Sequence, residues 1–400
     1  MKKFIIIGGN FLNSGAEAMT YVTVSELRRR YPNCEINLVY CLKENIDYKN
    51  LGFDIKYINS CMWSIMIKNA GLRTCAKAAK IQLLHKENLI QQFKEINKLL
   101  DVCDAVFDIS GYAISSQWGV ASTKRKIAEI SFIHSHKIPC FLMPQSFGPF
   151  DFGENKIVLM KKIKKTLGNC SCIYAREKEG YDLLTKELGL KNVKLSTDIV
   201  LQNKNLNISA VFRTFVPKRE INITTSNNVA IIPNMRNFDH GNKNDILFLY
   251  KTLVEYLLSV NRNIYLISHS EEDIEVCSLI KDMFSEFSTV HLITDKMDSF
   301  VFGEVIRNFD FAIASRFHSI VHSYKNEVPC VVLGWATKYR CLAELFEQEQ
   351  YMFDVRHLSL FSDIINATKQ MAENYLEEKK RIYENLCIIQ DNNCFDQIDF

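Results

Sequence analysis

The chain has 400 residues, of which 47% are hydrophobic and 24% are charged, and its formal net charge is +3. This composition is typical of a globular protein, and the length predicts two domains because one hydrophobic core seldom organises so long a chain. The nearly balanced charge argues against general nucleic-acid binding, and no apolar run is long enough to cross a bilayer.

The 13 cysteines do not form a disulfide or zinc framework in the sequence. They are scattered and odd in number, and the closely spaced Cys170 and Cys172 have no second pair of ligands to complete a zinc site. Cys387 and Cys394 lack zinc-ligand spacing as well. Because no signal peptide precedes the first strand-like run, we expect free thiols in the cytoplasm and predict neither metal nor cofactor.

Strand-like and helix-like segments alternate through the first half of the chain. Apolar runs predict strands at 4–8, 36–40, 55–58, 104–110, 139–143 and 193–195, and one more that begins at Cys172. Helical patterns lie between most of them, which is typical of a parallel α/β sheet. We therefore assign residues 1–205 to an N-terminal α/β domain.

Polar residues at the ends of these strands are candidate ligand contacts. The glycine-rich turn after the first strand carries Asn13, and either Asn13 or Ser14 could cap the next helix. An ordinary strand-to-helix turn explains this segment equally well. The loop Pro144–Pro149 is stiffened by its prolines and presents Gln145 and Ser146 at a strand's carboxyl end, where polar groups meet substrates.

Residues 61–100 are mostly helical and contain seven lysines and arginines against only Glu87 and Glu95. Such a basic amphipathic section can lie on an anionic membrane surface or attract a lipid diphosphate. A solvated helix face explains the same pattern. We favour the solvated face, because apart from Met62–Trp63 no aromatic cluster marks a membrane-facing stripe.

A second α/β series follows a break in the pattern. Residues 206–227 are polar and mixed, and we predict that they connect two domains. Further strands are predicted at 229–232, 264–267, 290–293, 311–314 and 328–334. We assign 228–362 to a C-terminal α/β domain and 363–400 to a long charged helix and tail that cross back to the first domain. Two such domains facing across a cleft could hold a donor and an acceptor, as a group transferase requires.

The stretch Asp310–Arg340 carries the strongest chemical signal. A buried strand runs into Ser315–Ser319 and a helix start, where free N–H groups and the helix dipole favour an anion. Arg316 adds planar donors for carboxylate or phosphate, and His318 can give or take a proton near neutral pH. Lys338 follows the next strand and should face the same pocket. We predict an anion-binding, proton-donating site, while a hydrogen-bonded structural histidine is the alternative.

Two further histidines near this stretch, His322 and His269, are candidate ligands. His318 and His322 are four residues apart on the predicted helix, but no carboxylate or third ligand completes a metal site. His269 follows the strand at 264–267 and is a candidate contact for donor or acceptor. The neighbouring Ser270 is expected to cap the next helix.

Six short segments, in order along the chain, resemble the motifs of the polysaccharide pyruvyl transferase family. They are Asn13–Ala18, Asp108–Gly111, Pro144–Pro149, Ala175–Glu177, Thr197–Asp198, and Ser315–Ser319 together with Pro329 and Lys338. Two departures stand out. Ala16 lies where the family usually has aspartate, and Tyr112 replaces a family glycine, both on the side expected to hold the acceptor.

The resemblance implies a GT-B-like fold of two Rossmann-like domains and transfer of pyruvate from phosphoenolpyruvate to two hydroxyls of a sugar. The product would be a cyclic ketal on a cell-surface polysaccharide or its precursor, with release of phosphate. Catalytic roles fall to Arg316 and His318. The expected donor site adds Arg236, Lys338, Ser319 and His269. The expected acceptor site comprises Asn13, Glu17, Asp108, Ser110, Gln145, Arg176 and Asp198, and the base that activates the sugar is Glu17, Asp108 or Asp198.

The expected partners are phosphoenolpyruvate and a glycan or lipid-linked saccharide, in the cytoplasm or at the inner face of the membrane. Two other functions fit the residues. One is a GT-B glycosyltransferase that uses a nucleotide sugar, although no pair of glutamates with seven residues between them occurs after Ser299. The other is a catalytically decayed glycan-binding protein, which Ala16 favours. The acceptor sugar and the question of a homo-oligomer stay open.

Overall fold

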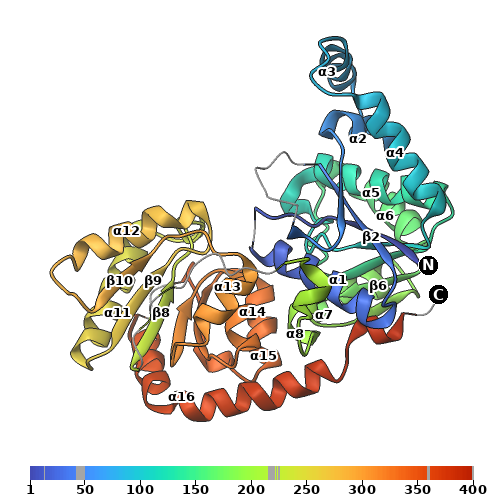
Figure 1. Cartoon of the computed structure of the whole chain (residues 1–400). Coiled ribbons are helices and arrows are strands. Elements are labelled where there is room, and N and C mark those ends of the chain that lie inside the picture. Colours follow the sequence, from blue (N-terminus) through green and yellow to red (C-terminus); the bar gives the residue numbers. More distant parts are fainter. Residues whose placement is uncertain are drawn as a thin grey trace.

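The computed structural model describes residues 1–12, 14–41, 50–214, 221, 223, 226–357 and 361–398. It contains two parallel β-sheets with helices packed around them (Figure 1). The first sheet consists of β1 (Lys3–Ile7), β2 (Glu35–Tyr40), β3 (Asp54–Tyr57), β4 (Ala105–Asp108), β5 (Cys140–Gln145), β6 (Cys172–Ala175) and β7 (Val193–Leu195). The second consists of β8 (Asn228–Ile232), β9 (Asn263–Ile267), β10 (Val290–Ile293), β11 (Phe311–Ala314), β12 (Cys330–Gly334) and β13 (Met352–Asp354).

Helices connect the strands. In the first half they are α1 (Ser14–Arg30), α2 (Ser60–Met66), α3 (Leu72–Leu83), α4 (Leu89–Val102), α5 (Gly119–Ser135), α6 (Lys156–Leu167), α7 (Lys178–Asp182), α8 (Ile199–Gln202) and α9 (Ile208–Val211). In the second half they are α10 (Asn237–His240), α11 (Lys243–Ser259), α12 (Ile274–Met283), α13 (Ser299–Ile306), α14 (Phe317–Lys325), α15 (Thr337–Leu345) and α16 (Phe361–Gln390). Among these described helices, none is both long and apolar enough to span a membrane.

Both sheets wind outward from a central first strand. The strand orders are β3-β2-β1-β4-β5-β6-β7 and β10-β9-β8-β11-β12-β13, so the direction of winding reverses between β1 and β4 and between β8 and β11. Their central strands are fully buried, as expected for continuous apolar runs covered on both faces. Ligands of open α/β sheets bind at the carboxyl ends of the strands near such reversals. The predicted fold of two Rossmann-like parallel domains is confirmed.

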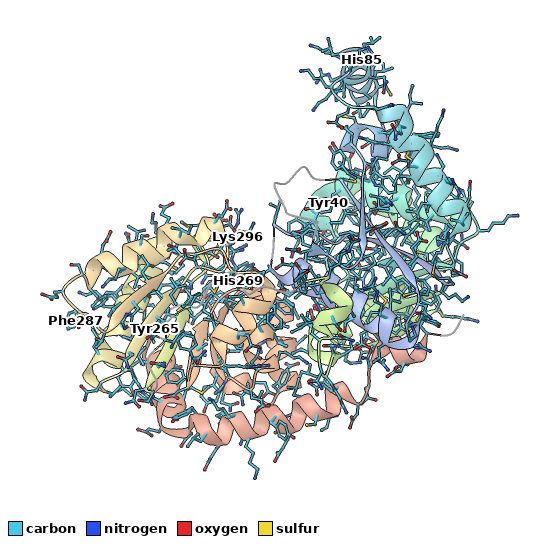
Figure 2. All side chains as sticks on the ribbon, viewed as in Figure 1. Tyr40, His85, Tyr265, His269, Phe287 and Lys296 are labelled. Atoms are coloured by element: carbon cyan, nitrogen blue, oxygen red, sulfur yellow. The ribbon has the colours of Figure 1, made fainter. Side chains whose placement is uncertain are left out.

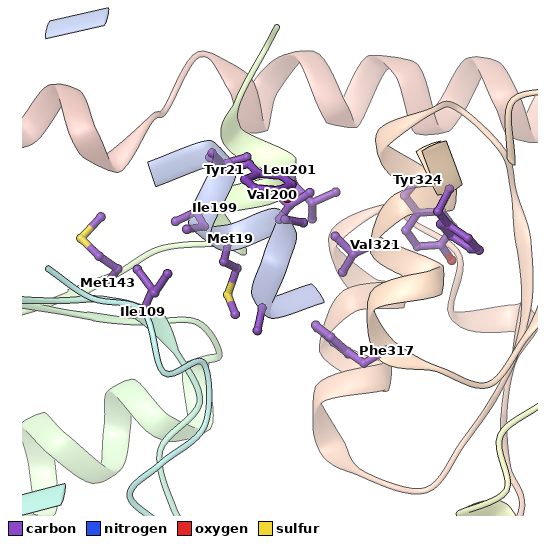
Figure 3. Packing of buried hydrophobic residues seen from close by; sticks show 14 of the residues in the cluster. Met19, Tyr21, Ile109, Met143, Ile199, Val200, Leu201, Phe317, Val321 and Tyr324 are labelled. Carbon is purple, nitrogen blue, oxygen red and sulfur yellow. The ribbon is translucent and has the colours of Figure 1, made fainter. Parts of the chain in front are cut away.

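One hydrophobic cluster joins the two halves of the chain (Figure 3). Met19 of α1 and Leu201 of α8 come from the first half, and Val321 and Tyr324 of α14 come from the second. Each such side chain contributes about 1.5–3 kcal/mol when it is fully removed from water. The apolar contact therefore fixes α14, and the residues at its start, against α1 and α8 of the first half.

The predicted return of the C-terminal helix to the first sheet is confirmed. α16 runs along the second half, and the residues after it reach β6, where the Tyr174 hydroxyl donates to the Cys394 carbonyl at 3.3 Å. The Cys394 N–H donates to the Gln202 side chain at 2.7 Å. Figure 1 shows α16 passing beneath both sheets. The chain end thus ties the two halves together.

The structure differs from the predicted elements in a few places. β13 was not predicted, since it is three residues long and only half-buried. The predicted strand 104–110 ends at Asp108, because the chain turns there and the Ser110 N–H donates to Asp108 at 3.0 Å. The predicted linker 206–227 lies partly outside the described residues; its first part forms α9, which packs on α1. The proposed domain boundaries stay predictions.

Candidate functional site

His318 lies where the two halves of the chain meet. It is the second residue of α14, which begins at the carboxyl end of β11, and its side chain is 17% exposed. The imidazole packs against the first turn of α1. A Cβ atom on Gly15 would lie 2.0 Å from the His318 ring, so only glycine permits this approach. The contact couples a candidate proton donor in the second half to the first helix of the chain.

Two predicted acceptor residues lie next to this histidine. Asp198 caps α8 by accepting from the Val200 N–H at 3.0 Å, and its other oxygen accepts from Arg176 at 2.9 Å. The His318 Nε2 atom is 3.8 Å from that second oxygen and has no hydrogen-bond partner among the described residues. A small movement of the imidazole would complete a hydrogen bond with Asp198.

Arg176 is buried in a polar network at the carboxyl end of β6. Its Nε donates to Glu177 at 2.9 Å and its Nη2 donates to the Ser146 hydroxyl at 2.7 Å. Ser146 in turn donates to Glu177 at 2.8 Å. Burial lowers the pKa of Arg176, but Glu177 and Asp198 outweigh it, so the pKa is raised. The guanidinium is therefore a permanent positive charge.

A second cation, the Lys338 ammonium, lies near the same aromatic ring as Arg176. The Arg176 guanidinium lies 4.5 Å from the centre of the Phe317 ring, and the Lys338 ammonium lies 5.1 Å from it. Both contacts are of the cation–π type. Burial, followed by the charge of Arg176, lowers the pKa of Lys338 to about 8. The predicted proximity of Lys338 to the Arg316–His318 segment holds, since Phe317 lies between those two residues.

The two arginines predicted to bind the donor are paired with carboxylates. Arg316 donates from Nε to Asp273 at 2.9 Å and from Nη2 to the Ser270 hydroxyl at 2.9 Å, and it also contacts Glu272. Arg236, which is 56% exposed, lies 2.8 Å from the other oxygen of Glu272. Burial lowers the pKa of Arg316 but its acidic partners raise it overall, so the charge persists. Glu272 is thus shared by both arginines.

Ser270 caps the turn that supplies these acids, as expected from the sequence. Its hydroxyl donates to Asp273 at 2.8 Å, and the two residues form a reciprocal capping box. Asp273 is completely buried and also accepts from the Met235 N–H at 2.9 Å. The loops after β8, β9 and β11 therefore meet at one carboxylate.

Two more histidines extend the site. The rings of His269 and His322 lie edge-on to Phe302, at 4.8 and 5.5 Å between ring centres. Neither nitrogen of His269 has a hydrogen-bond partner within the described chain, and Figure 2 places this residue on the side of the second sheet that faces the first. Burial is the main cause that lowers the pKa of His269 well below its ordinary value and that of His322 to about 4.

The charges of these groups act on one another. Burial, then Arg176, His322 and Lys338, lowers the pKa of His318 well below its ordinary value. His269 responds to His318 and to Arg316, so it links the two parts of the site. At neutral pH the imidazoles are uncharged. The cluster contains four cations, but its arginines, Arg176, Arg236 and Arg316, are paired with carboxylates, so an anion would have to replace those carboxylates or bind near Lys338.

Three other predicted acceptor residues, Glu17, Asp108 and Ser110, have structural partners. Glu17 accepts from the Ser299 N–H at 2.7 Å, which caps α13, and from the Tyr21 hydroxyl at 3.0 Å. Asp108 accepts from the Ser110 hydroxyl at 2.6 Å and pairs with Lys126 at 2.7 Å.

The remaining predicted site residues are Gln145, Ser319 and Asn13. Gln145 is fully buried, and neither atom of its amide has a partner in the part of the chain that the structure describes. Ser319 donates to the Arg316 carbonyl at 2.7 Å, and Asn13 lies outside the described residues. Gln145 therefore offers unpaired polar atoms within the described chain.

Sequence reasoning did not assign Gly15, Phe317, Glu272 or Asp273 to the site. Gly15 follows the candidate residues Asn13 and Ser14, but no local feature of the sequence indicates that an imidazole packs against it. The acidic run Glu271–Asp273 after a predicted strand is the signal that could have identified partners for the arginines. Phe317 lies between Arg316 and His318 and resembled an ordinary core residue.

A metal could be held only elsewhere among the described residues. His134, Cys140 and Cys170 place one ligand atom each within 4.8 Å of one another, near the amino end of β5. A hydrogen bond with Cys170, then burial, raises the pKa of the Cys140 thiol well above its ordinary value, which disfavours metal binding. A hollow lined by Lys2, Asp104 and Lys194 also lies at the amino ends of the strands, away from His318.

Comparison with known proteins supports one family and one fold. The family model for polysaccharide pyruvyl transferase matches residues 13–337. No curated protein matches the chain. UDP-GlcNAc 2-epimerase from Methanocaldococcus jannaschii is similar in structure, with a TM-score of 0.58, 12% identity, and coverage of 97% of this chain and 100% of that one.

Two other solved structures are similar over nearly their whole length. UDP-GlcNAc 2-epimerase from Neisseria meningitidis has a TM-score of 0.53 and 15% identity, covering 98% of this chain and 97% of that one. An α,α-trehalose-phosphate synthase (UDP-forming) from Burkholderia vietnamiensis has a TM-score of 0.51 and 7% identity, covering 99% and 96%. At these identities the likeness shows the fold alone, which is GT-B-like.

Proposed function

The chain belongs to the polysaccharide pyruvyl transferase family, and on that premise we propose that it transfers pyruvate from phosphoenolpyruvate to a sugar. Two hydroxyls of a polysaccharide, or of its saccharide precursor, would receive the group as a cyclic ketal. The observation that best supports this proposal is the place of His318. It is a neutral, partly buried imidazole held between Gly15 and Asp198 beside the cations Arg176 and Lys338.

The cations are suited to a donor that carries a carboxylate and a phosphate. Arg316 and Arg236 share Glu272, and an incoming oxyanion would replace that carboxylate as their partner. The start of α14 adds free N–H groups and the positive end of its dipole. Lys338 supplies a point charge close to Phe317. The two arginines would thus exchange a carboxylate partner for an oxyanion of the donor, and neither would be left unpaired.

The reaction can be written with every proton assigned. His318 delivers a proton to the methylene carbon of the donor, and a sugar hydroxyl bonds to the adjacent cationic carbon. Phosphate then leaves, and the second hydroxyl closes the ketal. One hydroxyl proton replaces the proton that His318 gave, and the other leaves with the phosphate.

The charge of the donor controls when His318 can act. Burial, followed by the charge of Arg176, keeps its pKa low, while a bound phosphate would raise it, so the acid would form in the donor complex. Of the three candidate bases, Asp198 lies 3.8 Å from His318, while Glu17 and Asp108 already accept hydrogen bonds that hold the fold. We propose that Asp198 orients the imidazole.

The affinity for phosphoenolpyruvate is expected to fall as the pH rises above about 8, the pKa of Lys338. The charged ammonium attracts the anion, and raising the pH removes that charge, so the dissociation constant should rise by up to about tenfold per pH unit. In Lys338→Arg the charge persists, so the rise should be smaller and should keep only the part linked to protonation of His318. Calorimetric titrations between pH 7 and 10 measure it, and equal slopes for both proteins would exclude Lys338 from the site.

Replacing Gly15 with alanine is expected to lower turnover by about a hundredfold, because the new methyl group would displace the His318 ring. The melting temperature should change little if the ring can turn aside. Gly71→Ala is the matched control, since a Cβ there meets nothing within 4 Å. Phosphate release from phosphoenolpyruvate reports turnover, and equal rates for both variants would show that the position of the ring does not matter.

The proposed function is tested by incubating the protein with phosphoenolpyruvate and a panel of glycan acceptors. The expected result is release of phosphate together with a gain in mass by one acceptor that corresponds to a pyruvate ketal. A nucleotide-sugar glycosyltransferase of the same fold is the second candidate. A rise in melting temperature with UDP, and none with phosphoenolpyruvate, would replace our proposal with it.

We place this reaction in the cytoplasm. All thirteen cysteines are free in the structure, although several are buried near others, which supports a reducing compartment. Neither a metal nor a cofactor enters the proposed steps.

A further inference from the structure

The helices α2, α3 and α4 form an arm that projects from the first sheet (Figure 1). His85, in the turn between α3 and α4, lies at its outer end (Figure 2). The arm has only a small core of its own, made by Cys61, Ala78 and Leu89. Most of α3 therefore faces solvent, and this helix covers neither sheet.

The exposed surface of α3 is divided into two stripes. Leu72, Ala76, Ala79 and Leu83 are exposed and recur every three or four residues, so they line one face of the helix. Arg73, Lys77 and Lys80 are exposed at the same spacing and line the adjacent face. Ala78 is buried on the remaining face. An apolar stripe thus runs beside a basic one.

The apolar stripe is more exposed than a solvated helix face requires. Leu72 is 91% exposed and Leu83 is 77% exposed. Leu84, Ile90 and Phe93, in and after the turn that ends the arm, are also exposed. The interpretation of this section as an ordinary solvated face, which we favoured from the sequence, does not account for these side chains.

The charge of α2, α3 and the turn after α3 has one sign. Residues 60–86 contain five lysines and arginines and no aspartate or glutamate. A basic surface of this kind complements anionic headgroups, and exposed leucines beside it can enter the boundary between headgroups and acyl chains. We propose that α3 and the turn that follows it bind the surface of an anionic membrane.

The position of the arm suits this role. α2 begins directly after β3, at the carboxyl edge of the first sheet, which is the edge that carries Asp108, Ser146 and Arg176. α3 lies at the outer end of the arm, so a membrane could meet it without touching either sheet (Figure 1). The proposal goes beyond the proposed reaction and does not depend on it.

Sedimentation with lipid vesicles tests the proposal on the full chain. The protein is expected to sediment with phosphatidylcholine vesicles that contain phosphatidylglycerol, far less with pure phosphatidylcholine, and less at high salt because salt screens the attraction. Leu72→Ser/Leu83→Ser and Arg73→Gln/Lys77→Gln/Lys80→Gln should each weaken binding by about tenfold or more. These side chains are exposed, so the fold and the binding of phosphoenolpyruvate should be unchanged.

A variant of α6 provides the control. Lys161→Gln/Lys162→Gln/Lys165→Gln removes the same number of exposed charges at another place and should bind vesicles like the parent. Absence of vesicle binding, or an equal loss in the α6 variant, would overturn the proposal. So would a lipid-free dimer that Leu72→Ser/Leu83→Ser converts to a monomer, because the stripe would then be a subunit interface. Failure of the proposed reaction would instead abolish phosphate release while leaving vesicle binding intact.

Discussion

Replacing His318 with alanine will lower turnover by about 10²- to 10⁴-fold, the usual contribution of a general acid, while phosphoenolpyruvate still binds. The imidazole is the group that can carry a proton between solvent and the donor carbon, and its Nε2 has no hydrogen-bond partner among the described residues. Its removal leaves the cations that hold the donor in place. Phosphate release measures turnover, and calorimetry with phosphoenolpyruvate measures binding.

A control variant at another histidine distinguishes loss of the proton donor from a general effect of replacing a histidine. His357 is exposed, and His357→Ala should retain parental turnover. His318→Gln keeps a polar group of similar reach but cannot donate an acidic proton, so it should be as inactive as His318→Ala. Parental turnover in either His318 variant would remove this residue from the mechanism.

Replacing Arg316 with alanine will weaken the binding of phosphoenolpyruvate by about 1.5–3 kcal/mol, the range for a hydrogen bond to a charged group. This corresponds to roughly ten- to more than a hundredfold in the dissociation constant. The planar guanidinium can hold two oxygens at once, which explains why Arg316→Lys should recover only part of the affinity. An unchanged dissociation constant for Arg316→Ala would refute donor binding by this residue.

Two controls are needed because Arg316 also neutralises a buried acid. Asp273 is completely buried, and loss of its arginine partner is expected to lower the melting temperature. Arg316→Lys keeps the positive charge near Asp273 and so tests binding in a stable fold. Arg307→Ala removes an exposed arginine that pairs with Glu304, and it should leave donor affinity unchanged.

The histidines of the candidate site are uncharged near neutral pH, and this lowers the free-energy cost of burying them. Three imidazoles are neutral near pH 7, and Lys338, with a pKa of about 8, loses its proton just above neutral pH. Burying the same groups fully charged would be far more costly without a bound anion. Binding of the donor can then draw protons into the site, which links affinity to the formation of the catalytic acid.

The sequence was sufficient to predict the alternating architecture and the segment Arg316–His318. Buried parallel strands appear as continuous apolar runs, and a polar turn directly after such a run falls at the carboxyl edge of the sheet. Lys338 could be placed near this segment for the same reason. These are local patterns, and they depend on residues that lie close together in the chain.

The rest of the site could not be predicted because it depends on contacts between distant residues. Nothing in the sequence around Gly15 says that His318, three hundred residues later, packs on it. The pairing of Arg316 with Asp273 and Glu272 arises from loops on different strands. Glu17, a candidate base by position, turns out to cap α13 across the junction.

The central claim is that phosphoenolpyruvate binds the cationic cluster and thereby protonates His318. Calorimetric titration of phosphoenolpyruvate at pH 8, in buffers with different enthalpies of ionisation, tests it most directly. We predict that the parent protein takes up more protons on binding than His318→Ala does, although both bind the donor. Absence of binding by the parent, or equal proton uptake by the two proteins, would contradict the claim.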